Sequence, residues 1–181
     1  MHEIIFAGFG GQGVLLMGQL VAYAAMSEGK EVSWFPSYGA EMRGGTANCA
    51  VVVSETTVGS PVVSEPTAIV VMNRPSLERF LPMLRPGGML VYNSSLIEVE
   101  PGRADINIVA VPANEIANQL GSNRVANMVA LGALLKGTGV VSAAGVMKAL
   151  AKALPPHRQD LLPVNQAALE RGQAFSPKAA V

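Results

Sequence analysis

Short apolar runs alternate with longer helical segments along this chain. Strands are predicted at the runs of β-branched and apolar residues, which are 4–7, 32–35, 47–53, 68–72, 89–92 and 106–111. Helices are predicted at 14–26, 75–84, 113–120, 123–136, 142–154 and 163–172. This order predicts an α/β fold, which is a three-layer Rossmann-like arrangement with a mostly parallel sheet and a helical C-terminal part.

The length of 181 residues suits a single domain, which we expect to cover 1–172. Residues 173–181 are expected to form a disordered tail. Gly29 is predicted to end the first long helix, Ser142 to cap a later one, and the proline pair at 155–156 to break that one.

Composition narrows the function classes. Only 14% of the residues are charged, against about 25% in an average soluble domain, so part of the surface is expected to be covered by partners. A formal net charge of zero gives no electrostatic argument for nucleic acid or an anionic membrane. With no long apolar span and no basic leader, a cytoplasmic location is expected. The one cysteine, Cys49, leaves no internal disulfide or cysteine-rich cluster and is predicted to be a buried, inert thiol.

A glycine turn follows the first strand and opens a long apolar helix. It contains Gly8, Gly10, Gly11, Gln12 and Gly13, and three of its glycines fit the G-x-G-x-x-G spacing. Such a turn lets a phosphate approach bare backbone at the positive end of a helix dipole. The alternative is that the glycines serve only a tight turn and close helix packing. Both interpretations stay open.

A second polar cluster lies in the loop 36–45 and the start of the strand after it. In a parallel sheet this loop and the glycine turn share one edge, where ligands bind. An arginine beside paired glycines suits a carboxylate or phosphate, and a tyrosine suits a partner contact. An exposed surface turn is the alternative. The candidate ligand or interface residues are Tyr38, Glu41, Arg43, Gly44, Gly45, Thr46 and Asn48.

Other catalytic signals are weak. A dinucleotide-binding domain should carry an acid at the end of its second strand, but here that strand ends at Phe35 and runs into Pro36. His2 and His157 lie near no expected site, and there is no nucleophile elbow, P-loop or metal-binding motif. A free-standing NAD-type oxidoreductase remains the alternative function.

Segments 7–14 (AGFGGQGV) and 36–48 (PSYGAEMRGGTAN) together closely resemble the gamma subunit of the 2-oxoacid:ferredoxin oxidoreductases, and the likeness extends over nearly the whole chain. The resemblance implies oxidative decarboxylation of a 2-oxoacid to acyl-coenzyme A and CO₂, with reduction of ferredoxin. It implies that alpha, beta and often ferredoxin-like delta subunits supply thiamine diphosphate and iron–sulfur clusters. The isolated chain would then be inactive.

The resemblance also suggests roles for the two motifs. The glycine turn would accept a phosphate of coenzyme A, and Arg43 with its glycines would line the approach or brace the partner subunits. A purely architectural role for both is the alternative. The amino-acid sequence of segment 36–48 favours a 2-oxoglutarate or branched-chain enzyme over a pyruvate enzyme. An isolated chain could also form a homodimer through exposed partner surface.

Overall fold

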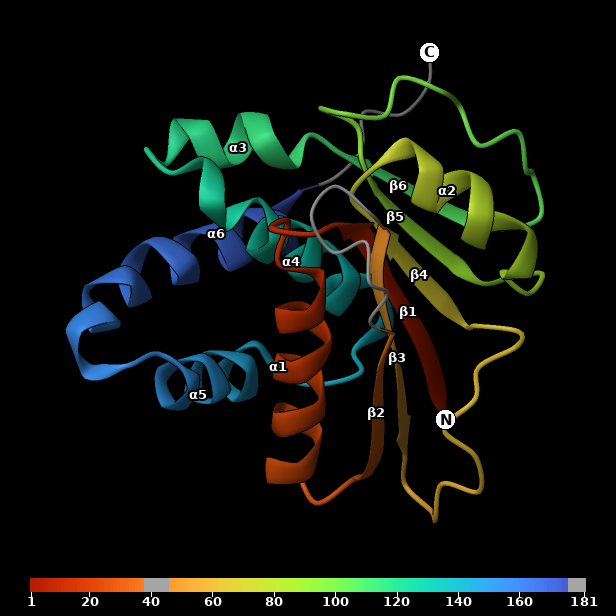
Figure 1. The fold of residues 1–181 in the computed structure, drawn as a ribbon, viewed down its shortest axis with the longest axis horizontal. Coiled ribbons are helices and arrows are strands. Elements are labelled where there is room, and N and C mark those ends of the chain that lie inside the picture. The colour runs from red at the N-terminus through yellow and green to blue at the C-terminus, as the bar shows by residue number, and fades with distance from the viewer. Residues whose placement is uncertain (38–45, 176–181) are drawn as a thin grey trace.

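The computed structural model describes residues 1–37 and 46–175, and there it forms one sheet covered by helices on both faces (Figure 1). The strands are β1 (His2–Phe9), β2 (Glu31–Ser37), β3 (Thr46–Ser54), β4 (Ala68–Val71), β5 (Met89–Asn93) and β6 (Asn107–Val111). The α-helices are α1 (Val14–Ser27), α2 (Arg74–Phe80), α3 (Ala113–Gln119), α4 (Ala126–Thr138), α5 (Ala143–Ala153) and α6 (Leu162–Ala174). Short 3-10 helices are η1 (Leu81–Met83), η2 (Asn123–Val125) and η3 (Pro156–Leu161).

The predicted helix boundaries are close to the observed ones. Gly29 follows α1 with a φ of 78°, and the Ser142 hydroxyl accepts a hydrogen bond from the amide of Gly145, which caps α5. The C-terminal boundary differs, because α6 continues to Ala174 and Phe175 still packs on the core. The last helix therefore extends past the expected domain end at 172, and residues 176–181 lie outside the described part.

The strand order is β2-β3-β1-β4-β5-β6, and β3 is the one strand among these six that runs against the others. The sheet is therefore mostly parallel, as the sequence predicts. Because β3 lies between β1 and β2, the end of β2 is one strand further from the glycine turn than in a dinucleotide-binding fold. Glu31 stands at the start of β2, at the opposite edge of the sheet from that turn.

Two hydrophobic cores lie on the two faces of the sheet. The helices α1, α4, α5 and α6 gather on one side and α2 on the other (Figure 1). Every residue of β1 from Ile4 to Ala7 is buried, because both faces of this strand are covered. No helix in the described ranges is long and apolar enough to cross a membrane.

The helices α4 and α6 cross at a pair of glycines. Every α4 residue from Ala126 to Leu135 is buried between the sheet and its helix neighbours, so α4 serves internal packing. A methyl group on Gly132 would overlap the carbonyl oxygen of Leu169, and one on Gly172 would overlap that of Val129. The two backbones are thus in direct contact, which only glycine permits at these positions.

We expect Gly172→Ala to lower the free energy of unfolding by about 2–3 kcal/mol, because α4 and α6 must move apart to admit the methyl group. Denaturant unfolding followed through Trp34, the chain's one tryptophan, measures this. Gly59→Ala is the matched control, since that glycine faces open space and should change stability by less than about 0.5 kcal/mol. Equal stability of the two variants would contradict the proposed close contact.

Candidate functional site

The carboxyl ends of β1 and β4 form a topological switch point. These strands are neighbours, yet α1 leaves β1 over one face of the sheet and α2 leaves β4 over the other. The two connections diverge and leave a crevice beyond the strand ends, where open α/β sheets bind their ligands. The glycine turn lies at this crevice.

The side chain of Gln12 joins the two strand ends. Its Oε1 accepts a hydrogen bond from the amide of Phe9 (2.7 Å), and its Nε2 donates to the carbonyl of Met72 (3.1 Å). A methyl group on Gly8 would lie 2.7 Å from that Oε1, so Gly8 makes room for the amide. Gly8 and Gln12 therefore have a structural role, and the Gln12 amide is occupied.

The end of the turn opens toward solvent. Gly11 and Gly13 have φ angles of 94° and 73°, which other residues rarely adopt. Gly13 precedes α1, whose first turn has no side-chain cap and no acidic residue, so its free amides and positive dipole end are open to an anion. Asn127 packs against Gly13 and donates to its carbonyl (3.5 Å).

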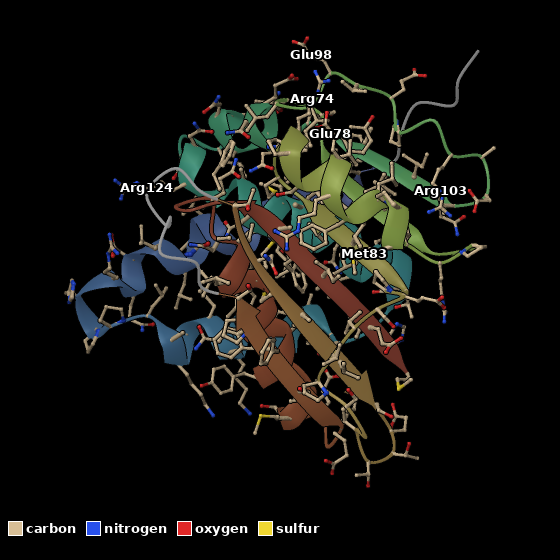
Figure 2. All side chains as sticks on the ribbon, turned by 45° about the vertical axis from the view of Figure 1, so that its right-hand side comes forward. Arg74, Glu78, Met83, Glu98, Arg103 and Arg124 are labelled. Carbon is tan, nitrogen blue, oxygen red and sulfur yellow. The ribbon has the colours of Figure 1, made fainter. Side chains whose placement is uncertain are left out.

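Two hollows meet at this turn and share Gly11, Arg124 and Asn127. We call the larger one, about 620 Å³ between the turn, η2, α5, η3 and the start of α6, the glycine-turn hollow. Its charged side chains are Arg124, Arg158 and Asp160, together with His157. Two guanidinium groups against one carboxylate make it suited to an anion. Figure 2 places Arg124 on the opposite side of the molecule from Arg103.

A chain of asparagines fixes η2 beside the smaller hollow, which measures about 260 Å³. Asn93 donates to Asn114 and Asn114 donates to Asn123, each at 2.6 Å. The Asn93 oxygen also accepts from the amide of Ala113 (3.2 Å), which anchors α3 to the end of β5. These bonds hold the backbone next to Arg124, so this arginine projects from a supported element.

The predicted site residues fall into three groups. Gly11 and Gly13 line a hollow, Gln12 braces the turn and also lines the smaller hollow, and Gly8 makes room for the Gln12 side chain, with Gly10 between them in the sequence. Thr46 and Asn48 belong to β3, where they pair with Phe9 and Ala7. These last two residues of the second cluster therefore lie at the same end of the sheet as the glycine turn. Tyr38, Glu41, Arg43, Gly44 and Gly45 lie outside the described residues.

Sequence reasoning missed the far wall of the hollow. Arg124, Asn127, His157 and Arg158 come from segments more than 100 residues after the turn. The sequence predicts no site near His157, but this side chain lines the hollow because η3 folds back toward the start of α1. Two local features of the sequence mark where these segments change direction. They are Gly121, between two predicted helices, and the proline pair before His157.

Residues 3–175 match the family described as pyruvate ferredoxin/flavodoxin oxidoreductase, and the chain belongs to this family. It is 47% identical over 133 residues to ketoisovalerate oxidoreductase subunit VorA of Methanothermobacter thermautotrophicus. That match covers 74% of this chain but only 28% of VorA, so the chain spans little more than a quarter of that relative.

Two solved structures share the fold. The gamma subunit of keto/oxoacid ferredoxin oxidoreductase from Geobacter sulfurreducens superposes with a TM-score of 0.81 at 31% identity, covering 97% of this chain and 100% of that one. The 2-oxoglutarate:ferredoxin oxidoreductase of Magnetococcus marinus, solved with 2-oxoglutarate, coenzyme A and succinyl-CoA bound, gives 0.87 at 27% identity. It covers 96% of this chain and 30% of that one.

Gln12→Glu tests the bridge between the strand ends. The new carboxylate can still accept from Phe9 but cannot donate to the Met72 carbonyl, so we expect a loss of about 1–3 kcal/mol in the free energy of unfolding. Gln119→Glu is the control, because within the described ranges the one hydrogen bond of its side chain is accepted from Arg171, which a carboxylate does equally well. A Gln12 variant as stable as the control would show that the bridge contributes nothing.

Cys49 provides a pH test of the core beneath α1. Burial raises the pKa of its thiol to about 12, which outweighs the opposing contact with Trp34. Because the folded state holds the proton more tightly, the resulting stability is present below pH 9 and is lost as pH rises toward 12. At pH 8 we expect a thiol reagent to modify Cys49 readily in the unfolded chain. In the folded chain we expect the modification to be slower by a factor of about a hundred or more. Rapid labelling of folded protein would contradict this.

Proposed function

We propose that this chain is the gamma subunit of a 2-oxoacid:ferredoxin oxidoreductase, working with alpha, beta and ferredoxin-like delta subunits. Family membership and a full-length match to a gamma subunit support this assignment. The enzyme would convert a 2-oxoacid and coenzyme A into acyl-coenzyme A and CO₂, passing two electrons to ferredoxin. The isolated chain would be inactive.

The residues present do not fit the redox cofactors. One cysteine cannot hold an iron–sulfur cluster, and this thiol is buried in the core beneath α1. The sequence also contains no Gly-Asp pair with which a thiamine diphosphate motif could begin. Thiamine diphosphate and the clusters are therefore assigned to partner subunits, and this chain is left with binding and positioning.

The glycine-turn hollow is the proposed site for a phosphate of coenzyme A. The observation that carries this proposal is the uncapped start of α1 facing a hollow with Arg124 and Arg158. Helix amides and guanidinium forks together suit a phosphate, whereas the adjacent Asp160 would repel it unless the ligand binds toward the arginines. The related Magnetococcus enzyme was solved with coenzyme A, which agrees with this ligand class.

Within this scheme each group has a limited task. The amides at the start of α1 orient the phosphate, and Arg124 and Arg158 neutralise its charge. Asn127 keeps Gly13 in position through its hydrogen bond. The loop with Arg43 is assigned to the approach or to a subunit contact, and this assignment stays a prediction.

The substrate is proposed to be a branched-chain 2-oxoacid or 2-oxoglutarate. The 47% identity to a ketoisovalerate enzyme subunit favours the first, and the fold match to a 2-oxoglutarate enzyme supports the second. A free-standing NAD enzyme finds no support, because no acid stands at the end of β2 and the relatives are oxoacid oxidoreductases. A cytoplasmic location stays a prediction.

The coenzyme A site is tested with Arg124→Gln and Arg158→Gln in the assembled enzyme. We expect each change to raise the KM for coenzyme A about tenfold and to leave kcat at saturating coenzyme A unchanged, because a binding charge is lost and no reacting group is touched. Viologen reduction at varied coenzyme A concentrations, with the 2-oxoacid saturating, measures both constants.

Arg74→Gln is the matched control. This arginine is 61% exposed and pairs with Glu78 on α2, on the other face of the sheet (Figure 2). It should leave the KM for coenzyme A unchanged. If the three variants behave alike, the hollow does not bind coenzyme A, and the glycine turn is purely architectural.

A further inference from the structure

A second cleft lies between α1 and α5, outside the proposed coenzyme A site. We call it the α1–α5 groove; its volume is about 410 Å³, and Leu16 also lines the glycine-turn hollow. Its walls include Leu16, Gln19 and Tyr23 from α1 and Lys148, Ala149 and Lys152 from α5. The spacing of these residues shows that one stripe of each helix faces the groove.

The groove carries positive charge and no negative charge. Lys148 and Lys152 are exposed, lie one helical turn apart, and make no hydrogen bond or ion pair within the described ranges. Neither α1 nor α5 contains an acidic residue. The chain has a net charge of zero, so two neighbouring lysines with no carboxylate on either helix create a local excess of positive charge. An acidic partner would neutralise this charge.

An exposed aromatic side chain lies in the lining of the groove. Tyr23 lines the groove and is 49% exposed, and Met26, which lies three residues further along α1 and outside the lining, is 58% exposed. Tyrosine and methionine are enriched at the centres of protein interfaces, where they contact apolar side chains of the partner. The combination of an aromatic surface with flanking ammonium groups therefore suits an amphipathic, acidic segment.

One end of the groove is fixed by polar contacts. Glu28, directly after α1, accepts two hydrogen bonds of 2.7 Å from the amide and hydroxyl of Ser142, the cap of α5. Lys30 pairs with the same carboxylate (3.3 Å) and donates to the carbonyl of Val140 (2.7 Å). The two helices are thus clamped together, so the groove exists before a partner binds and little ordering is needed.

We propose that the α1–α5 groove receives an acidic amphipathic helix of a partner subunit. Carboxylates one turn apart on that helix would meet Lys148 and Lys152, and its apolar face would cover Tyr23. The α1 stripe from Leu16 to Ser27 is about 16 Å long, enough for roughly three turns of a helix. The inference rests on the proposed function, since it requires the chain to be a subunit.

Zero-length carbodiimide cross-linking of the purified complex tests the contact, because this reagent joins an ammonium only to a carboxylate that touches it. Mass spectrometry should find Lys148 or Lys152 linked to Asp or Glu of another subunit. The double change Lys148→Glu and Lys152→Glu should weaken association about tenfold at low salt, with a smaller effect for Gln at both positions. Arg79→Glu with Arg85→Glu, two exposed charges on and after α2, is the matched control.

The remaining outcomes overturn the inference in distinguishable ways. Cross-links to a second copy of this chain would assign the groove to a homodimer, and protection of the lysines by coenzyme A alone would assign it to that ligand. A complex that forms while both lysines stay open to acetylation rejects the docking site but leaves the gamma-subunit proposal standing. Elution of the unmodified chain without partners rejects both.

Discussion

The arrangement of the proposed site depends on how the carboxyl ends of β1 and β4 are joined. Their helices leave over opposite faces of the sheet, while at the paired strand ends the Met72 amide donates to the Ala7 carbonyl (2.9 Å). The Gln12 side chain adds a second link between these ends by bonding the Phe9 amide and the Met72 carbonyl. The side-chain amide of Gln12 thus satisfies the Phe9 N–H and the Met72 carbonyl, which would otherwise need water. This holds the glycine turn in place and leaves the start of α1 open.

The opposite wall of the hollow depends on packing far from the turn. The glycine contact holds α6 against α4, and η3, which leads directly into α6, places His157 and Arg158 at the hollow that Gly11 also lines. Asn127 lies near the start of the same buried helix and contacts Gly13. One helix, α4, therefore connects the core, the turn and the cationic wall.

The low charge content of the chain agrees with a subunit rather than an independent enzyme. The charged side chains at the proposed functional surfaces are mostly basic. Arg124 and Arg158 lie with Asp160 at the glycine-turn hollow, and Lys148 and Lys152 lie at the α1–α5 groove. No nucleophile or metal motif accompanies them in the sequence. Both proposed surfaces would recognise anions, a small ligand at the glycine-turn hollow and a protein segment at the α1–α5 groove.

The sequence by itself determined the elements and the glycine turn, because these follow from local periodicity and from backbone freedom. Runs such as Ile4–Ala7 and the cap at Ser142 act within a few residues and can be predicted. The insertion of β3 beside β1, the structural use of Gln12, and the return of Arg158 to the turn were decided only by the tertiary structure. Each of these three features depends on contacts between segments far apart in the chain. A local sequence pattern cannot predict such contacts.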